Sequence, residues 1–270
     1  ARNGPPRWGH VARTLVAVQA QPLRAEAKEE GPECVQEQGA PGLTRPDDWS
    51  GRGAAYARCD PELERLMRVV FMGTPDFAVP TLNAVVEAGH EVVCVVAQPD
   101  RKSGRGQKLQ SPPVAARAKA LGLPLSQPRA IRSGRFPERV KSLQADVAVV
   151  LAYGRILTRE LLDAPRLGCV NVHASLLPRW HGAAPIQAAI LAGDAVTGVC
   201  TQQMEEGLDT GPIFCSESMM LANDETGGSL HDKLMVMSAR VAVQTLDVME
   251  GISPVPQSEE GICWAPKISK

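Results

Sequence analysis

An asparagine and a histidine two positions apart, Asn171 and His173, lie in the stretch GCVNVHASLLPRWHGAAPIQ. The stretch begins with apolar residues typical of a buried strand, and the two-residue period of a strand places both side chains on one face. The amide can donate to a developing oxyanion, and the imidazole can stabilise charge or move a proton near neutral pH. The pair therefore predicts a reaction that develops oxyanion and ammonium charge. The same pattern would also result if both side chains only formed hydrogen bonds to the backbone at the end of a strand.

A carboxylate that could join this pair occurs in GLDTGPIF, where Asp209 lies in a glycine-bounded turn before a predicted strand. Close to His173, it would orient the imidazole and accept a proton from an amine, directly or through water. An Asp in such a turn can also serve only as a local hydrogen-bond acceptor for its own backbone. The sequence does not by itself bring Asp209 to His173, so their proximity is a hypothesis.

The elements that must position these residues form an alternating series from Met67 onward. Short apolar runs such as MRVVFMG and ADVAVVLAYG predict buried strands, and DFAVPTLNAVVEAG predicts a helix with Asp76 as its N-cap and Gly89 as its stop. Alternating strands and helices predict an α/β fold, an open, mostly parallel and Rossmann-like sheet flanked by helices. Ligands bind at the carboxyl ends of such strands, and polar or glycine-rich segments follow predicted strands at residues 73–77, 98–109, 152–155 and 171–182.

The composition excludes several classes of protein. The 29 basic and 30 acidic residues give a net charge of −1, so any nucleic-acid surface must be local. The sequence has neither a G-x-G-x-x-G fingerprint nor a phosphate-binding loop, which leaves nucleotide cofactors without support. The seven cysteines are scattered without a C-x-x-C pair, so we expect reduced thiols, mostly buried, and no metal site. No apolar run reaches the roughly 18 residues that span a membrane.

The N-terminal segment, residues 1–67, is rich in Gly, Pro, Ala and Arg and lacks a sustained apolar period. Its stretch PPRWGHVARTLVAVQAQPLR carries arginines and no acid, and its first turns suit the basic amphipathic helix with which an organelle transit peptide begins. An acidic stretch follows from Glu26 to Glu37, which is less typical of such a peptide. The segment is interpreted as a transit peptide in preference to a disordered, non-targeting extension.

Several motifs occur in a fixed order along the chain: GTPDF, PDRKSGRGQKL, ADVAVVLAYGRIL, NVHASLLPRWHGAAPIQ and GLDTGPI. Together they resemble the methionyl-tRNA formyltransferases, from Met67 to the C-terminus. The run NVHASLLPRWHGAAPIQ is specific for the tetrahydrofolate-dependent formyltransferase superfamily, and GTPDF with PDRKSGRG points within it to the methionyl-tRNA enzymes. The resemblance implies transfer of a formyl group from the co-substrate 10-formyltetrahydrofolate to the α-amine of methionine on initiator tRNA, without a metal.

The resemblance also implies roles for particular residues. Asn171 and His173 would stabilise the tetrahedral oxyanion, and Asp209 would fix His173 and help to remove the proton of the amine. His181, which this chemistry does not need, is interpreted as a contact or surface residue. A loop with a cis bond before its proline would line the folate site, namely Ser175, Leu176, Leu177 and Pro178. A local patch of basic residues would bind the phosphates of the tRNA, namely Arg101, Lys102, Arg105 and Lys108.

The resemblance divides the chain into the extension of residues 1–67, a catalytic domain of residues 68–258, and residues 259–270 as the start of a linker to a C-terminal tRNA-binding domain that we expect this chain to lack. Formylated initiation implies an organelle, with the mitochondrion slightly preferred over the plastid, and the family implies a monomer. Two alternatives stay open. One is another 10-formyltetrahydrofolate-dependent formyltransferase or hydrolase, against which the basic loop argues. The other is a catalytically impaired folate- or tRNA-binding fragment.

Overall fold

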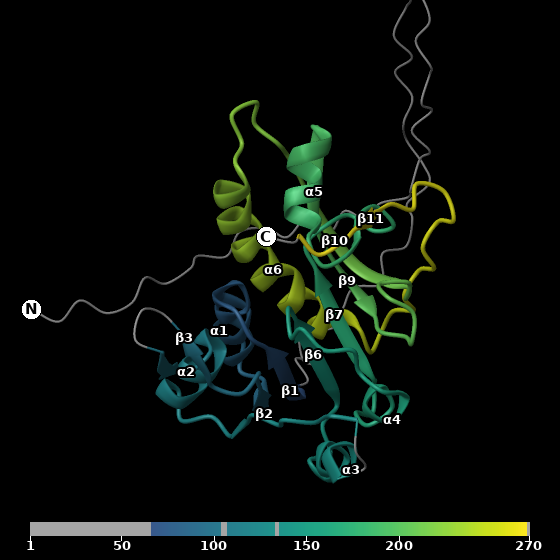
Figure 1. Cartoon of the computed structure of the whole chain (residues 1–270). Coiled ribbons are helices and arrows are strands. Elements are labelled where there is room, and N and C mark those ends of the chain that lie inside the picture. The colour runs from purple at the N-terminus through teal and green to yellow at the C-terminus, as the bar shows by residue number, and fades with distance from the viewer. Residues whose placement is uncertain (1–65, 104–106, 133–134, 269–270) are drawn as a thin grey trace, which may run out of the picture. The chain divides into compact units, whose positions relative to one another are not determined.

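The computed structural model describes residues 66–103, 107–132 and 135–268. The segment interpreted as a transit peptide therefore lies outside the described residues, except for its last two positions. Within the described part, a seven-stranded sheet carries the candidate site (Figure 1). Its strands follow in the order β10 (Ile213–Met220), β9 (Val196–Gln203), β7 (Cys169–His173), β6 (Val147–Leu151), β1 (Arg68–Gly73), β2 (Glu91–Val96) and β5 (Leu125–Ser126).

The sheet is parallel from β5 to β7, and β9 is antiparallel to both of its neighbours. The predicted open, mostly parallel sheet is therefore confirmed, with antiparallel pairing confined to one edge. In the parallel part, the carboxyl ends of all strands meet at the same edge of the sheet, where ligands bind in folds of this class.

Two hydrophobic cores lie on opposite faces of the sheet, and β1 contributes to both. Val69 and Phe71 belong to one core, and Val70 and Met72 belong to the other. Strands buried on both faces need apolar residues at every position, which explains the continuous apolar runs in the sequence. Helices that contribute residues to the first core are α1 (Val79–Glu87), α2 (Pro113–Ala120), α5 (Pro185–Ala192) and α6 (Gly227–Val248). The second core is closed by α3 (Arg135–Ser142) and α4 (Arg159–Leu162).

Short elements complete the fold and correct two expectations. Asp76 begins a 3₁₀ turn, η1 (Asp76–Ala78), and does not cap α1, whose N-cap is Ala78. The stop at Gly89 is confirmed, because α1 ends at Glu87 and Gly89 has a φ of 88°. The segment after β2, expected as a loop, forms a hairpin of β3 (Arg101–Ser103) and β4 (Lys108–Gln110). A second small sheet joins β8 (His181–Gly182) to β11 (Trp264–Ala265).

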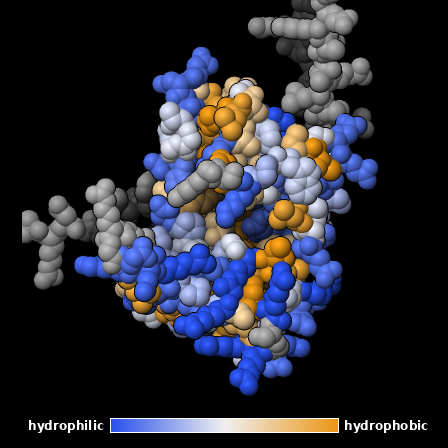
Figure 2. All heavy atoms as spheres, in the orientation of Figure 1, coloured by the Kyte–Doolittle hydropathy of each residue, from blue (hydrophilic) through white to orange (hydrophobic). Residues whose placement is uncertain are grey.

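The cysteines in the described part are free thiols, as expected. Burial raises the pKa of Cys169 and of Cys200 to about 12, so neither thiol is a nucleophile at neutral pH. None of the described helices combines the length and the hydrophobicity needed to cross a bilayer. The face shown in Figure 2 is mainly hydrophilic, and its hydrophobic residues form separate small patches.

Candidate active site

Strand β7 places Asn171 and His173 at the predicted edge of the sheet. His173 is the last residue of the strand and is only 6% exposed. The antiparallel register of β7 with β9 sets Asn171 opposite Gln202 and His173 opposite Cys200. Gln202 is therefore a member of the site that the sequence analysis missed. The pattern TGVCTQQM predicts the strand but does not give its register.

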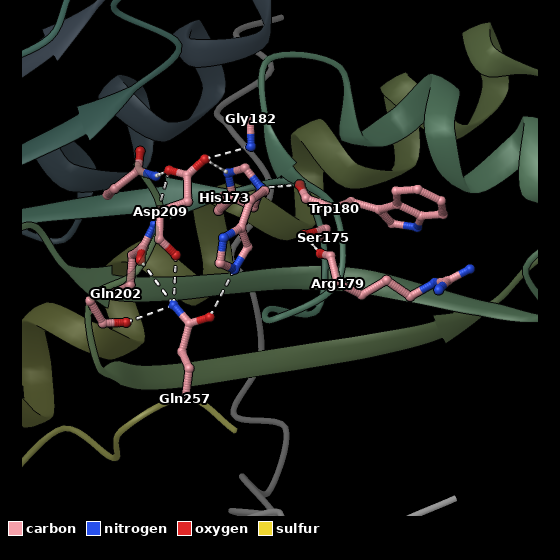
Figure 3. A network of polar contacts seen from close by, with 11 residues as sticks. His173, Ser175, Arg179, Trp180, Gly182, Gln202, Asp209 and Gln257 are labelled. Carbon is pink, nitrogen blue, oxygen red and sulfur yellow. Dashed lines mark hydrogen bonds and ion pairs between the residues drawn. The ribbon is translucent and has the colours of Figure 1, made fainter. Parts of the chain in front are cut away.

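Asp209 lies in the turn between β9 and β10 and is the centre of a network of polar contacts (Figure 3). Its Oδ1 accepts from Asn171 Nδ2 at 3.3 Å and from Gln202 Nε2 at 3.1 Å, and its Oδ2 accepts from the backbone N–H of Gly182 at 2.7 Å. The structure thus brings Asp209 to Asn171 and His173, which the sequence left as a hypothesis. The three donors fix the direction of the carboxylate.

His173 is oriented by a different partner from the one expected. Its Nε2 lies 3.0 Å from the carbonyl oxygen of Trp180, whereas its Nδ1 lies 3.9 Å from Asp209 Oδ2. A carbonyl only accepts, so Nε2 donates to it, and Nδ1 is the ring nitrogen that faces the carboxylate. The distance from Nδ1 to Oδ2 exceeds that of a hydrogen bond. Asp209 and His173 are therefore neighbours without a direct hydrogen bond.

The backbone of two site residues lies in the left-handed region, with φ values of 67° at Trp180 and 56° at Asp209. For residues with a side chain this conformation costs roughly 1–2 kcal/mol each and persists only where the surroundings hold it. At Trp180 it turns the carbonyl towards His173, and at Asp209 it directs the carboxylate towards β7. Gly211 in the same turn must be a glycine, because a Cβ there would lie 1.7 Å from the carbonyl oxygen of Gln203.

A clamp of three side chains, Arg179, Trp180 and Asp194, holds the loop that follows β7. Arg179 binds both carboxylate oxygens of Asp194, at 3.0 and 2.6 Å, and Trp180 Nε1 donates to Asp194 Oδ2 at 2.7 Å. The guanidinium also stacks over the indole, 4.3 Å from the ring centre. Burial alone would raise the pKa of Asp194, but the hydrogen bonds from Arg179 and Trp180 outweigh burial and lower it.

His181 was expected to be a contact or surface residue, and this was wrong. It is 2% exposed, it lies in β8, and its ring meets that of Trp264 edge to face at 5.2 Å. Its Nε2 bonds to Gln257 Oε1 at 3.1 Å. The backbone of residues 263–265, in the segment predicted as a linker, accepts from the amides of His181 and Ala183. This segment shows no strand or helix period, so the sequence pattern does not predict its contact with the site.

The predicted folate loop follows β7 and includes the expected cis bond between Leu177 and Pro178. Ser175 is fully buried, and its hydroxyl donates to the carbonyl of Arg179 at 2.7 Å. Leu177 is 7% exposed, whereas Leu176 and Pro178 are half-buried. Any contact of this loop with a ligand would therefore involve its backbone, Leu176 or Pro178.

Three of the predicted tRNA-binding residues lie on the β3–β4 hairpin. Arg101, Lys102 and Lys108 are exposed, and Arg105 lies outside the described residues. At the base of the hairpin, Asp100 accepts from Gln127 at 2.7 Å and from Ser111 at 3.0 Å. The anchored base positions a set of solvated cations.

The cluster on β7 can support acyl-type transfer to an amine. Asn171 supplies an amide donor, His173 a ring, and Asp209 a carboxylate that lies 3.3 Å from the amide and 3.9 Å from the ring. These are the groups that a tetrahedral intermediate with an ammonium proton requires. No group of three His, Cys, Asp or Glu side chains suited to a metal occurs within the described residues.

The sequence and the fold agree with comparisons to known proteins. The family model described as Formyl transferase matches residues 67–246, and the chain belongs to this family. Methionyl-tRNA formyltransferase of Roseobacter denitrificans is 55% identical over 204 residues, which cover 76% of this chain and 67% of the relative. The resemblance inferred from the motifs is thereby confirmed.

Two solved structures show the same fold. Phosphoribosylglycinamide formyltransferase from Bacillus halodurans is 26% identical with a TM-score of 0.57, over 68% of this chain and 95% of that one. An N-formyltransferase from Helicobacter canadensis, in complex with folinic acid and dTDP-3-aminofucose, is 16% identical with a TM-score of 0.58, over 75% of this chain and 71% of that one.

Proposed function

We propose that this chain transfers the formyl group of 10-formyltetrahydrofolate to the α-amine of methionine on initiator tRNA. The relatives at 50–55% identity that bear the name Methionyl-tRNA formyltransferase support the choice of acceptor. The observation that carries the proposal is the convergence of Asn171, His173 and Asp209 at one end of β7. The reaction must stabilise an oxyanion and remove an amine proton at a single place.

In the proposed reaction the amine lone pair attacks the formyl carbon, which forms a C–N bond and leaves negative charge on the formyl oxygen. The amide of Asn171 and the ring of His173 stabilise this oxyanion. Asp209 accepts the ammonium proton, directly or through a water. Collapse of the intermediate breaks the bond to the folate nitrogen, which takes up the proton that Asp209 accepted. The products are formyl-methionyl-tRNA and tetrahydrofolate.

Substrate contacts are assigned in the same proposal. Arg101, Lys102 and Lys108 would contact tRNA phosphates, because exposed cations on an anchored hairpin suit a polyanion. Arg105 is assigned the same role from its place in the sequence motif alone. The loop from Ser175 to Pro178 would line the folate site. Since Ser175 and Leu177 are buried, Leu176, Pro178 and the loop backbone would make those contacts.

The proposal is tested by assaying the purified chain with 10-formyltetrahydrofolate and methionyl-tRNA, beside Asp209→Ala. Asp163→Ala is the matched control, since it removes an exposed carboxylate whose partner is Arg159. Formyl transfer by the wild type and the control, but not by Asp209→Ala, supports the proposal. Formate release without any tRNA would instead indicate a hydrolase. Binding of folate without turnover in the wild type would indicate a binding module and reject the proposal.

The compartment and assembly are further proposals. The similar curated proteins come from bacteria, and the arginine-rich segment before residue 68 favours an organelle, the mitochondrion ahead of the plastid. A fluorescent protein fused behind residues 1–67 should enter mitochondria. Diffuse fluorescence would reject the transit peptide. We also propose a monomer, which sedimentation of the purified chain tests directly.

A further inference from the structure

Gln257 lies behind the Asp209 turn and contacts the site in a way that no motif of the sequence suggests. Its Nε2 donates to the carbonyl oxygen of Asp209 at 2.7 Å, to that of Gly211 at 2.8 Å and, more weakly, to Gln202 Oε1 at 3.3 Å. Its Oε1 accepts from His181 Nε2 at 3.1 Å. One carboxamide therefore joins the turn, β9 and β8 (Figure 3).

The contacts determine which end of the carboxamide faces which partner. Backbone carbonyls only accept, so the NH₂ group must face Asp209 and Gly211, and the oxygen must then face His181. Both hydrogen atoms of the NH₂ group are engaged by the turn. A residue of this length with a carboxylate would place an oxygen against two carbonyl oxygens.

The turn needs such a support because Asp209 has a φ of 56°. Without the hydrogen bonds to the carbonyls of Asp209 and Gly211, the backbone would lower its conformational energy by leaving the left-handed region. Relaxation would rotate the carboxylate away from Gly182, Asn171 and His173. A displacement of about 1 Å at a reacting group can cost about 100-fold in rate.

We infer that Gln257 is a positioning residue of the reaction: its carboxamide holds the Asp209 turn in the conformation that directs the carboxylate at Asn171 and His173. The inference rests on the proposed function. The hydrogen bonds of Gln257 do not reach the side chains of Asn171, His173 or Asp209. They reach the backbone of the Asp209 turn and the side chain of Gln202. It lies outside the conspicuous motifs, in the polar segment after α6.

The structure provides a readout that does not depend on activity. The amide of Gly182 donates to Asp209 Oδ2, whereas the neighbouring amide of His181 donates to the carbonyl of Cys263 at 2.8 Å. Hydrogen exchange at Gly182 therefore reports whether the carboxylate is in place. Exchange at His181 reports whether β8 and β11 remain paired.

The experiment compares Gln257→Ala and Gln257→Glu with Gln244→Ala, which removes an exposed glutamine of α6. For Gln257→Ala we expect kcat to fall about 10- to 100-fold with KM for both substrates nearly unchanged. Exchange at Gly182 should accelerate roughly tenfold, while His181 stays protected. Gln257→Glu should show the same loss near pH 7 and recover part of its kcat as pH falls, because a protonated carboxyl regains one donor.

Three outcomes would overturn the inference. The first is a Gln257→Ala variant with the kcat and Gly182 exchange of the control. The second is joint loss of protection at Gly182 and His181, which would show a general structural role. The third is a Gln257→Glu variant whose activity relative to wild type does not rise at low pH. A wild type that transfers no formyl group would reject the proposed function, while exchange at Gly182 would still show whether Gln257 holds the turn.

Discussion

The site cluster on β7 and the β3–β4 hairpin are built in opposite ways. In the cluster, the side chains of His173 and Asp209 are 8% and 11% exposed, and hydrogen bonds to Trp180 and Gly182 fix their directions. On the hairpin, Arg101 and Lys102 are exposed to solvent, and Leu109 is 69% exposed. Charges act strongly and at fixed positions where water is excluded, whereas solvated charges act at longer range and are screened by salt. Changes in the cluster should therefore alter turnover, and changes in the hairpin should alter affinity.

The largest effect should follow from His173→Gln. The substituted amide can still donate to the carbonyl of Trp180 but cannot act as an ionisable ring, so kcat should fall about 1,000-fold with KM for tRNA unchanged. His231→Gln, at a histidine with a partly exposed side chain, is the matched control and should retain full activity. If His173→Gln raised KM for tRNA without lowering kcat, the cluster would act in binding and not in turnover, which would contradict the comparison with the hairpin.

The next largest effect should follow from removing the charges of the hairpin. Replacing Arg101, Lys102 and Lys108 by alanine should raise KM for tRNA about 10- to 100-fold, with kcat at saturation unchanged. The salt dependence of binding should also weaken, by about 0.7–0.9 in logarithmic slope for each phosphate that the variant no longer neutralises. An equal number of cations is removed in the control, which replaces Arg135, Arg139 and Lys141 of α3. If the control raised KM for tRNA by the same factor, the hairpin cations would act only through the net charge of the protein and not as a local binding site.

A smaller effect, on stability, is expected from the clamp of Arg179, Trp180 and Asp194. Asp194→Asn should lower the free energy of unfolding by about 1–2 kcal/mol at pH 7, since it replaces an acceptor of charge-assisted bonds. The pKa of Asp194 is lowered in the folded chain from its ordinary value of 3.8. The wild-type carboxylate thus stabilises fully above about pH 4, and this contribution is lost as pH falls through the lowered pKa. Urea unfolding at pH 7 and pH 3 should show a gap between the proteins that shrinks at pH 3, and a constant gap would contradict the assignment.

The sequence predicted those parts of the site that depend on local pattern. A strand period of two was enough to place Asn171 and His173 on one face of β7, and alternating elements were enough for the class of sheet. The position of Asp209 beside them was only a hypothesis, because it depends on the turn between β9 and β10. Only the resemblance of the motifs to the formyltransferases implied that Asp209 acts together with Asn171 and His173.

Contacts between distant segments could not be predicted in the same way. Gln202 enters the site through the register of an antiparallel pair, which no single strand encodes. Gln257 enters it through hydrogen bonds from a segment without apolar periodicity, and His181 is buried because β11 pairs with β8. The hairpin was taken for a loop because its short strands carry charged residues, which are rare in buried strands but ordinary in exposed ones.

The smallest effect should come from Arg240→Gln, which removes the same kind of ion pair from an exposed position. Arg240 binds Glu217 at 2.5 Å, with side chains 56% and 36% exposed, whereas Asp194 in the clamp is 10% exposed. Both are bonds between a guanidinium and a carboxylate, but Asp194 is more buried and also accepts from Trp180. Loss of the exposed pair should change the free energy of unfolding by less than about 0.5 kcal/mol and leave kcat and KM unchanged. A loss as large as that of Asp194→Asn in the same urea titrations would mean that burial does not set the difference between the site and the surface.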